Sequence, residues 1–75
     1  MPEMKALAVK TKMIRKGIFH ETQLEFAQNC GISPDELSDI ENQHANPRLT
    51  TLQNIAAYTG LTVSELLDVK EDDQS

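Results

Sequence analysis

Apolar side chains recur along this chain at the three- and four-residue steps that mark one face of an amphipathic helix. The first series runs Met4, Leu7, Thr11, Ile14 and Ile18, with lysines between its members. Gly17 and the residues after it should end this first helix. No segment shows the strict alternation of apolar and polar residues that is typical of a half-buried strand. The pattern therefore predicts an all-α fold.

Four further helix starts are marked by a serine or threonine that is followed three residues later by Glu or Gln. In such a capping box, the hydroxyl accepts from the backbone N–H three residues on, and the Glu or Gln side chain reaches back. Pro34 adds to the signal after Ser33, because a missing N–H costs nothing at the first helical position. The four pairs are Thr22–Glu25, Ser33–Glu36, Thr50–Gln53 and Thr62–Glu65.

These starts, with the glycines and prolines between them, predict four helices after the first. Gly31 and Gly60 can end helices in the left-handed conformation, and Pro47 bars a helix through the loop 43–47. The expected helices are about 23–30, 34–42, 49–58 and 63–67. We therefore expect one compact five-helix domain over residues 1–69. Residues 70–75 include three consecutive acids and lack an apolar anchor, so we expect a disordered acidic tail there.

The composition limits the possible functions of this chain. Its 75 residues are enough for one domain, and with no Trp, one Tyr and two Phe they predict a small helical core rather than a deep ligand cavity. The single cysteine, Cys30, excludes an intrachain disulfide and fits a reducing compartment. No apolar run reaches the length of a signal peptide or a membrane span. We expect a cytoplasmic protein.

The charge is unevenly distributed. Residues 1–20 contain five Lys or Arg and one acid, whereas residues 21–75 contain two against eleven, and the net charge is −5. A nucleic-acid-binding domain is usually basic along its binding face. The lysines of the first helix have a simpler explanation as its solvated face.

The second and third expected helices form a helix-turn-helix pattern over residues 22–42. Ala27 is small, as a close crossing of the two helices requires. Leu37 and Ile40, three residues apart, put an apolar stripe of the third helix onto the second. In this arrangement the second helix of the pair is held out at a steep angle for the DNA major groove.

A more specific pattern extends over about residues 22–67. Its first part is Thr22-Gln23, Phe26-Ala27, Gly31-Ile32-Ser33, Leu37-Ser38 and Ile40-Glu41-Asn42. Its second part is Pro47, Leu49, Thr51-Leu52, Ile55-Ala56, Gly60-Leu61-Thr62 and Glu65-Leu66-Leu67. The chain resembles the Cro/repressor-type helix-turn-helix family, also called the Xre family. The resemblance implies a lambda repressor-like bundle of five helices that binds double-stranded DNA, usually as a homodimer.

The resemblance also implies which residues would contact DNA. The start of the second helix would meet a phosphate, the first turns of the third helix would face the groove, and the loop after it would meet the flanking backbone. The residues carried over are Gln23, Ser33, Asp35, Glu36, Asp39, Asn42, His44 and Arg48. A dimer contact would use the last helix and the segment before it. Those residues are Tyr58, Leu61, Val63, Leu66 and Leu67, although the last helix has an equally simple role as a cap on the core.

The chain departs from the family pattern at three places. The groove-facing positions of the third helix are acidic, where Gln, Arg, Ser or Lys are frequent. Gln43 stands at the usual glycine, and His44 at a position that is often Lys or Arg, which weakens a phosphate contact. The segment between Gly17 and Gln23 is longer than usual and places Phe19 and His20 in a loop.

The acids of the third helix have different explanations. Asp35 and Glu36 lie in its first turn, where they complement the helix dipole, and Glu36 completes the capping box. Asp39 has no such structural reason. The resemblance implies that Glu41 faces the first helix and pairs with a basic residue there. Lys12 and Arg15 are both candidates, and the spacing does not choose between them.

No catalytic or metal-binding set accompanies these features. Cys30 lies on an apolar helix face, which indicates a core thiol, and His20 and His44 lack a third ligand at metal spacing. We therefore expect neither an enzyme nor a cofactor. The sequence favours a dimeric, sequence-specific transcriptional regulator. The alternative is a protein-interaction module whose acidic third helix binds a basic partner, since a fold does not fix a function.

Overall fold

The computed structural model describes residues 2–44 and 46–68, and this part of the chain is helical with no strand. Its elements are α1 (Pro2–Met13), a π-helical turn η1 (Ile14–Ile18), α2 (Gln23–Cys30), α3 (Pro34–Glu41), α4 (Leu49–Thr59) and α5 (Val63–Leu67). The all-α fold and the approximate bounds of its helices are confirmed. The expected disordered tail, 70–75, lies outside the described residues. No described helix combines the length and the hydropathy that crossing a membrane would require.

Three of the four expected capping boxes are present. In α2, for example, the backbone N–H of Glu25 donates to Thr22 Oγ1 at 3.1 Å, and that of Thr22 donates to Glu25 Oε1 at 2.9 Å. Ser33 and Thr62 cap α3 and α5 in the same way. The expectation for Thr50 was wrong. The chain is extended at Arg48, so α4 begins one residue before Thr50 and has no side-chain cap.

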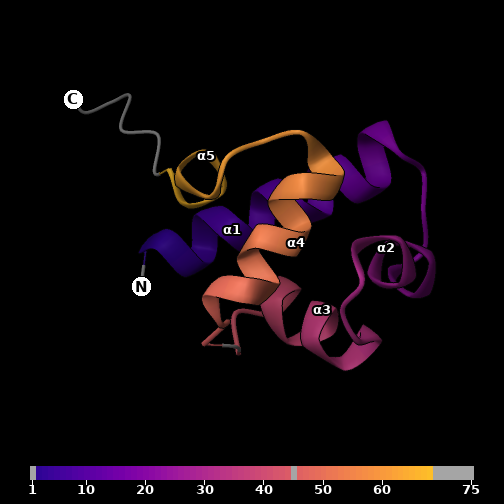
Figure 1. Ribbon diagram of the computed structural model, residues 1–75, viewed down its shortest axis with the longest axis horizontal. Helices are drawn as coiled ribbons and strands as arrows, with labels where there is room; N and C mark the ends of the chain where they lie inside the picture. Colours follow the sequence, from indigo (N-terminus) through magenta and orange to yellow (C-terminus); the bar gives the residue numbers. More distant parts are fainter. Residues whose placement is uncertain (1, 45, 69–75) are drawn as a thin grey trace.

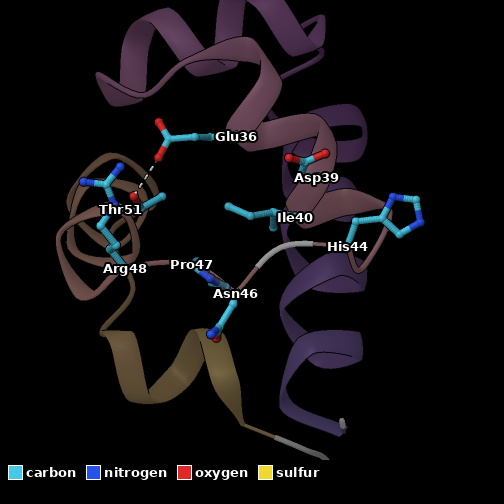
Figure 2. Close-up of a pocket in the computed structure, with 8 residues that line it drawn as sticks. All are labelled: Glu36, Asp39, Ile40, His44, Asn46, Pro47, Arg48 and Thr51. Carbon is cyan, nitrogen blue, oxygen red and sulfur yellow. Dashed lines mark hydrogen bonds between the residues drawn. The ribbon is translucent and has the colours of Figure 1, made fainter.

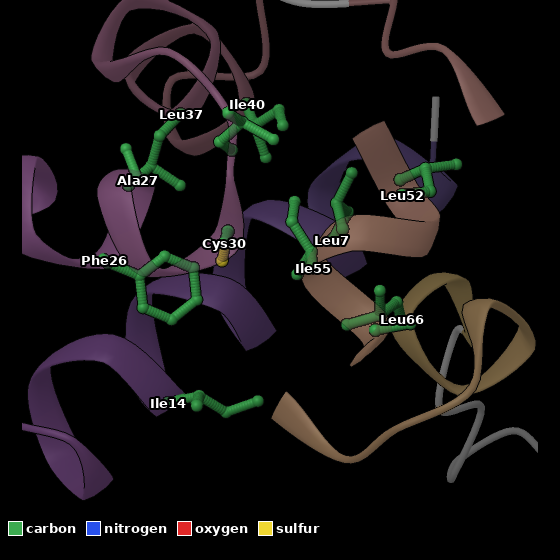
Figure 3. Close-up of a cluster of buried hydrophobic side chains, with 12 residues drawn as sticks. Leu7, Ile14, Phe26, Ala27, Cys30, Leu37, Ile40, Leu52, Ile55 and Leu66 are labelled. Atoms are coloured by element: carbon green, nitrogen blue, oxygen red, sulfur yellow. The ribbon is translucent and has the colours of Figure 1, made fainter. Parts of the chain in front are cut away.

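The helices pack around one apolar core. Helix α1 contacts α3 and α5, α2 contacts α3 and α4, and α4 contacts α5. Figure 1 shows α4 crossing in front of α1, with α2 and α3 at the far end from α5. Side chains from every helix meet at the centre (Figure 3). The buried apolar residues are Leu7, Ala8, Ile14, Phe26, Ala27, Cys30, Ile32, Leu37, Ile40, Leu52, Ile55, Ala56 and Leu66.

The π-helical turn changes which residues of the first series are buried. Leu7 and Ile14 lie in the core, but Ile18 is 65% exposed, contrary to the apolar series read from the sequence. The backbone N–H of Phe19 donates to Ile14 O at 2.9 Å, five residues back rather than four. This wider turn rotates Ile18 away from the apolar stripe.

Phe19 packs against the core instead of remaining in an open loop. Its ring lies 5.0 Å from that of Tyr58 and 6.2 Å from that of Phe26, between ring centres. The rings of Phe26 and Tyr58 lie edge to face at 5.4 Å. The longer segment before α2 therefore anchors an aromatic cluster, while its next residue, His20, stays exposed with a φ of +55°.

The helix-turn-helix has the expected local geometry. Gly31 has a φ of +81°, and its N–H donates to Ala27 O at 2.9 Å, which ends α2. Ala27 and Leu37 have no exposed surface, and Ile40 is 2% exposed. Helix α3 is therefore held against α2 by its apolar stripe, and its opposite face is turned outward.

Gln43 adopts the left-handed conformation after α3, with a φ of +61°. A side chain in this conformation is strained by about 1–2 kcal/mol, whereas glycine is not. Glycine also makes the unfolded chain more flexible, which removes about 0.4–1 kcal/mol of the gain. We expect Gln43→Gly to raise the free energy of unfolding by about 0.5–1 kcal/mol in urea titrations.

Gly31→Ala is the matched control for Gln43→Gly. Gly31 is also left-handed, and a Cβ there would meet no atom within 4 Å, so the substitution adds backbone strain alone. It should destabilise the chain. A loss of stability in Gln43→Gly would contradict the strain argument.

Candidate nucleic-acid interface

The outward face of α3 carries two carboxylates, those of Asp35 and Asp39, that have no partner in the described part of the chain. Asp35 and Asp39 lie one helical turn apart and are both exposed. Within residues 2–44 and 46–68, neither side chain has a hydrogen bond or a salt bridge. Both are therefore available to a ligand that approaches this face.

Glu36 is tied into the fold and is only half exposed. Its Oε1 accepts from the backbone N–H of Ser33 at 3.0 Å, and its Oε2 accepts from the Thr51 hydroxyl at 3.1 Å (Figure 2). These hydrogen bonds, that from Ser33 first, hold the pKa of Glu36 below its ordinary value. The side chain joins the first turn of α3 to the first turn of α4. This second link, through Thr51, was not foreseen from the sequence.

A shallow groove separates α3 from the loop that leads into α4 (Figure 2). It is lined by Glu36, Asp39, Ile40, His44, Asn46, Pro47, Arg48 and Thr51. The backbone N–H of His44 donates to Asp39 O at 2.8 Å, which fixes the start of the loop against α3. In Figure 2, Arg48 lies across the groove from His44. The structure thus gathers four of the expected contact residues around one concave surface: Glu36, Asp39, His44 and Arg48.

A buried ion pair fixes the position of α3 relative to η1. Arg15 Nε donates to Glu41 Oε2 at 2.7 Å, and Arg15 Nη2 donates to Glu41 Oε1 at 2.8 Å. Arg15 Nη1 donates to the backbone oxygen of Glu21 at 2.9 Å. The structure therefore selects Arg15 as the partner of Glu41, and Lys12 is exposed. The fork geometry of a guanidinium suits this two-bond contact better than an ammonium does.

The protonation of this pair is set by opposing effects. Burial on its own would raise the pKa of Glu41, but hydrogen bonds from Arg15 and Gln23 and the nearby positive charge lower it below its ordinary value. The hydrogen bond to Glu41 raises the pKa of Arg15 despite its burial. Both groups therefore remain charged inside the fold.

Gln23, expected at a phosphate, is oriented by the same pair. Its Nε2 donates to Glu41 Oε1 at 2.9 Å, and the side chain is half-buried at the start of α2. The Arg15–Glu41 pair thus links η1 and α3 to the first residue of α2. Ser33 and Asn42 flank α3 and are exposed, and the amide of Asn42 donates to Ser38 Oγ at 3.4 Å. Contact of these residues with DNA stays a prediction.

The expected dimer residues do not form one exposed surface. Leu66 has no exposed surface and belongs to the core, so its assignment to a dimer contact was wrong. Tyr58 is half-buried, and its hydroxyl donates to Glu21 Oε2 at 2.7 Å, a contact that raises its pKa. Leu61, Val63 and Leu67 are each half-buried at the edge of the core. These three keep some surface for a partner.

Cys30 and the histidines do not form a reactive site. Cys30 is buried, and burial together with the charge of Glu21 raises its pKa to about 12, so the thiol stays protonated. Within the described residues, no three His, Cys, Asp or Glu side chains gather in a way that could hold a metal ion.

The fold, with α2, the turn at Gly31 and α3 packed as described, defines a domain of the helix-turn-helix class. A family model described as helix-turn-helix matches residues 22–66. The chain belongs to this family, in its Cro/repressor-type (Xre) form.

Two individual proteins are similar to the chain. The immunity repressor protein of Bacillus phage phi105 is 37% identical over 46 residues, which are 61% of this chain and 32% of the repressor. The chain thus matches about a third of that protein's length. The crystal structure of a hypothetical transcription factor, NHTF, from Neisseria superposes with a TM-score of 0.80 at 25% identity. That match covers 92% of this chain and 78% of the other.

Proposed function

We propose that this protein is a sequence-specific DNA-binding regulator of transcription that inserts α3 into the major groove. The observation that carries the proposal is the outward face of α3, where Asp35 and Asp39 are exposed and unpaired within the described chain. The family and the names of both similar proteins, a repressor and a transcription factor, support it.

The free carboxylates would favour specific contacts over general attraction to DNA. An Asp side chain can accept a hydrogen bond from cytosine N4 in the major groove. The same charge repels phosphate and cancels the attraction of a helix N-terminus for anions. We therefore propose that Asp35 and Asp39 read bases, while Gln23, His44 and Arg48 meet the phosphate backbone. Because few of these phosphate-contacting residues are cationic, the affinity for DNA should fall only shallowly as the salt concentration rises.

We further propose that the protein binds as a homodimer through the surface that Leu61, Val63 and Leu67 leave exposed, beside Tyr58. A two-fold dimer would place two α3 helices about 34 Å apart, one turn of DNA. The operator should then be a near-palindrome. Selection from random duplexes at low salt tests this, and no enriched sequence would contradict the whole proposal.

The Asp39→Ala variant tests the role of α3 directly. We expect its preference for the selected sequence over unrelated DNA to fall by about 5- to 150-fold, the effect of losing one good base contact. Affinity for unrelated DNA should rise slightly, because a negative charge is removed. Fluorescence anisotropy with both duplexes measures the two affinities.

Glu3→Ala is the control for this test. Glu3 is an exposed acid at the start of α1, so the change in net charge is the same. It should leave the preference unchanged. If Asp39→Ala and Glu3→Ala behave alike, α3 does not read bases.

One observation also favours the alternative, a protein-interaction module. Helix α3 carries no Lys or Arg, so Asp35 and Asp39 present a face that suits a basic protein. A variant that combines Asp35→Lys with Asp39→Lys discriminates between DNA binding and protein binding. Glu36 is left intact because it holds α3 to α4. Recovery of the same partner by this variant in pull-downs would count against the alternative.

A further inference from the structure

Helix α1 carries an exposed apolar ridge that the helix-turn-helix does not use. Val9 is 55% exposed and Met13 is 58% exposed, and they lie one turn apart on the same helix face. They are two of only five large apolar side chains that are exposed in the described chain. Exposed apolar surface that is continuous in this way marks interaction sites more often than isolated residues do.

A groove runs along each side of this Val9–Met13 ridge. One groove lies towards the end of α3 and includes Ala8, Lys12, Lys16 and Gln43. The other lies towards α5, which sits beside α1 (Figure 1), and includes Lys5, Lys10 and Leu61. Their volumes are about 450 and 770 Å³. A ridge between two grooves is the surface that another helix needs in order to pack its own side chains against α1.

The charges around the ridge select the kind of partner. On the α3 side the exposed ions are Lys12 and Lys16, since Glu41 is buried and paired with Arg15. On the α5 side Lys10 donates to the backbone oxygens of Glu65 and Asp68, and the carboxylates of those residues offset the lysines there. The unbalanced positive charge therefore lies beside the α3-side groove. It suits acidic side chains that flank an apolar stripe.

We propose that the Val9–Met13 ridge is a docking site for an acidic amphipathic helix of a partner protein. Such a helix would place apolar side chains at three- and four-residue spacing over the ridge and carboxylates beside Lys12 and Lys16. A second copy of this chain fits less well. A two-fold contact through α1 would set the lysines of one copy against those of the other. The inference does not depend on DNA binding.

The experiment is a display selection of random peptides of about 16 residues, roughly four helical turns, on the full chain. We expect enriched peptides that are acidic and carry apolar residues at helical spacing. Affinity of the best peptide is then measured by fluorescence anisotropy. Val9→Ser with Met13→Ser should weaken it by about tenfold or more, as loss of a central apolar contact does. Both side chains are exposed, so the variant should keep its circular dichroism and its unfolding midpoint.

Two matched controls locate the contact. Leu24→Ser alters a side chain of similar exposure, 53%, on α2, and should leave the affinity unchanged. Lys16→Glu should weaken binding, whereas Arg48→Glu, the same charge change beside α4, should not.

Four outcomes would overturn the proposal. The first two are enrichment of no peptide family, and enrichment of basic or uncharged peptides. The third is tighter peptide binding after removal of residues 69–75, because the acidic end of this chain would then be the occupant. The fourth is binding to phosphatidylglycerol vesicles, lost in the Val9→Ser Met13→Ser variant, without any peptide enrichment, because the surface would then be a lipid site.

Discussion

Replacing Arg15 by methionine is expected to lower the free energy of unfolding by about 3–5 kcal/mol, because it leaves a buried carboxylate without its cation. The side chains of Arg15 and Glu41 are 8% and 2% exposed, so water cannot replace the lost partner. A domain of this size has about 4–11 kcal/mol of stability in total. The single variant should therefore be close to unfolding, and Glu41→Gln should behave similarly. Urea titration followed by circular dichroism measures the loss.

The double variant Arg15→Met with Glu41→Leu should recover most of this stability. A buried ion pair is often no more stabilising than apolar side chains of similar volume, because both charges must be desolvated. Lys12→Met is the control, since Lys12 was the other candidate partner and is exposed. It should change stability by no more than about 0.5 kcal/mol. An equal loss in Lys12→Met and Arg15→Met would contradict the assignment of the pair.

The same pair makes stability depend on pH. The pKa of Glu41 is lowered in the folded chain, so its contribution is fully present above the unfolded value of about 4.3 and is lost as the pH falls through the lower folded value. Glu36 acts in the same direction. The urea midpoint of the wild type should fall between neutral and acid pH. It should fall less in the Arg15→Met Glu41→Leu variant.

The second large effect is expected at Leu66. Leu66→Ala should lower the free energy of unfolding by about 2–5 kcal/mol, since the side chain is fully buried and its removal leaves a cavity. Because the loss arises within one chain, it should not depend on protein concentration. Urea titrations at several concentrations test this.

Leu67→Ala is the matched control, because the next residue in α5 is only half-buried. Its free energy of unfolding should fall less than that of Leu66→Ala. If the proposed dimer forms, sedimentation equilibrium should show weaker association for Leu67→Ala. The assignment of Leu66 to the core would be contradicted by a Leu66→Ala chain that unfolds normally but no longer dimerises.

Local sequence was sufficient to predict the helices and the turn of the helix-turn-helix. Capping boxes at Thr22, Ser33 and Thr62 and the glycine at Gly31 act within about one helical turn, so neighbouring residues decide them. The apolar periodicity likewise predicted that Leu37 and Ile40 face α2. The resemblance to the family rests on matches at single positions of the sequence, and it supports the same helices that these local signals predict.

The features that the sequence left undecided, or for which its prediction was wrong, depend on contacts between distant segments. The choice of Arg15 over Lys12, the burial of Leu66, the link from Glu36 to Thr51 and the hold of Glu41 on Gln23 all join residues from different elements. The π-helical turn rotates Ile18 outward, and Phe19, which follows it, packs against the core. The sequence by itself therefore determined the helices, the turn and the acidic character of α3. Only the tertiary structure decided which carboxylates form hydrogen bonds within the fold and which, at Asp35 and Asp39, have no partner among residues 2–44 and 46–68. That depends on how the packed helices place their side chains.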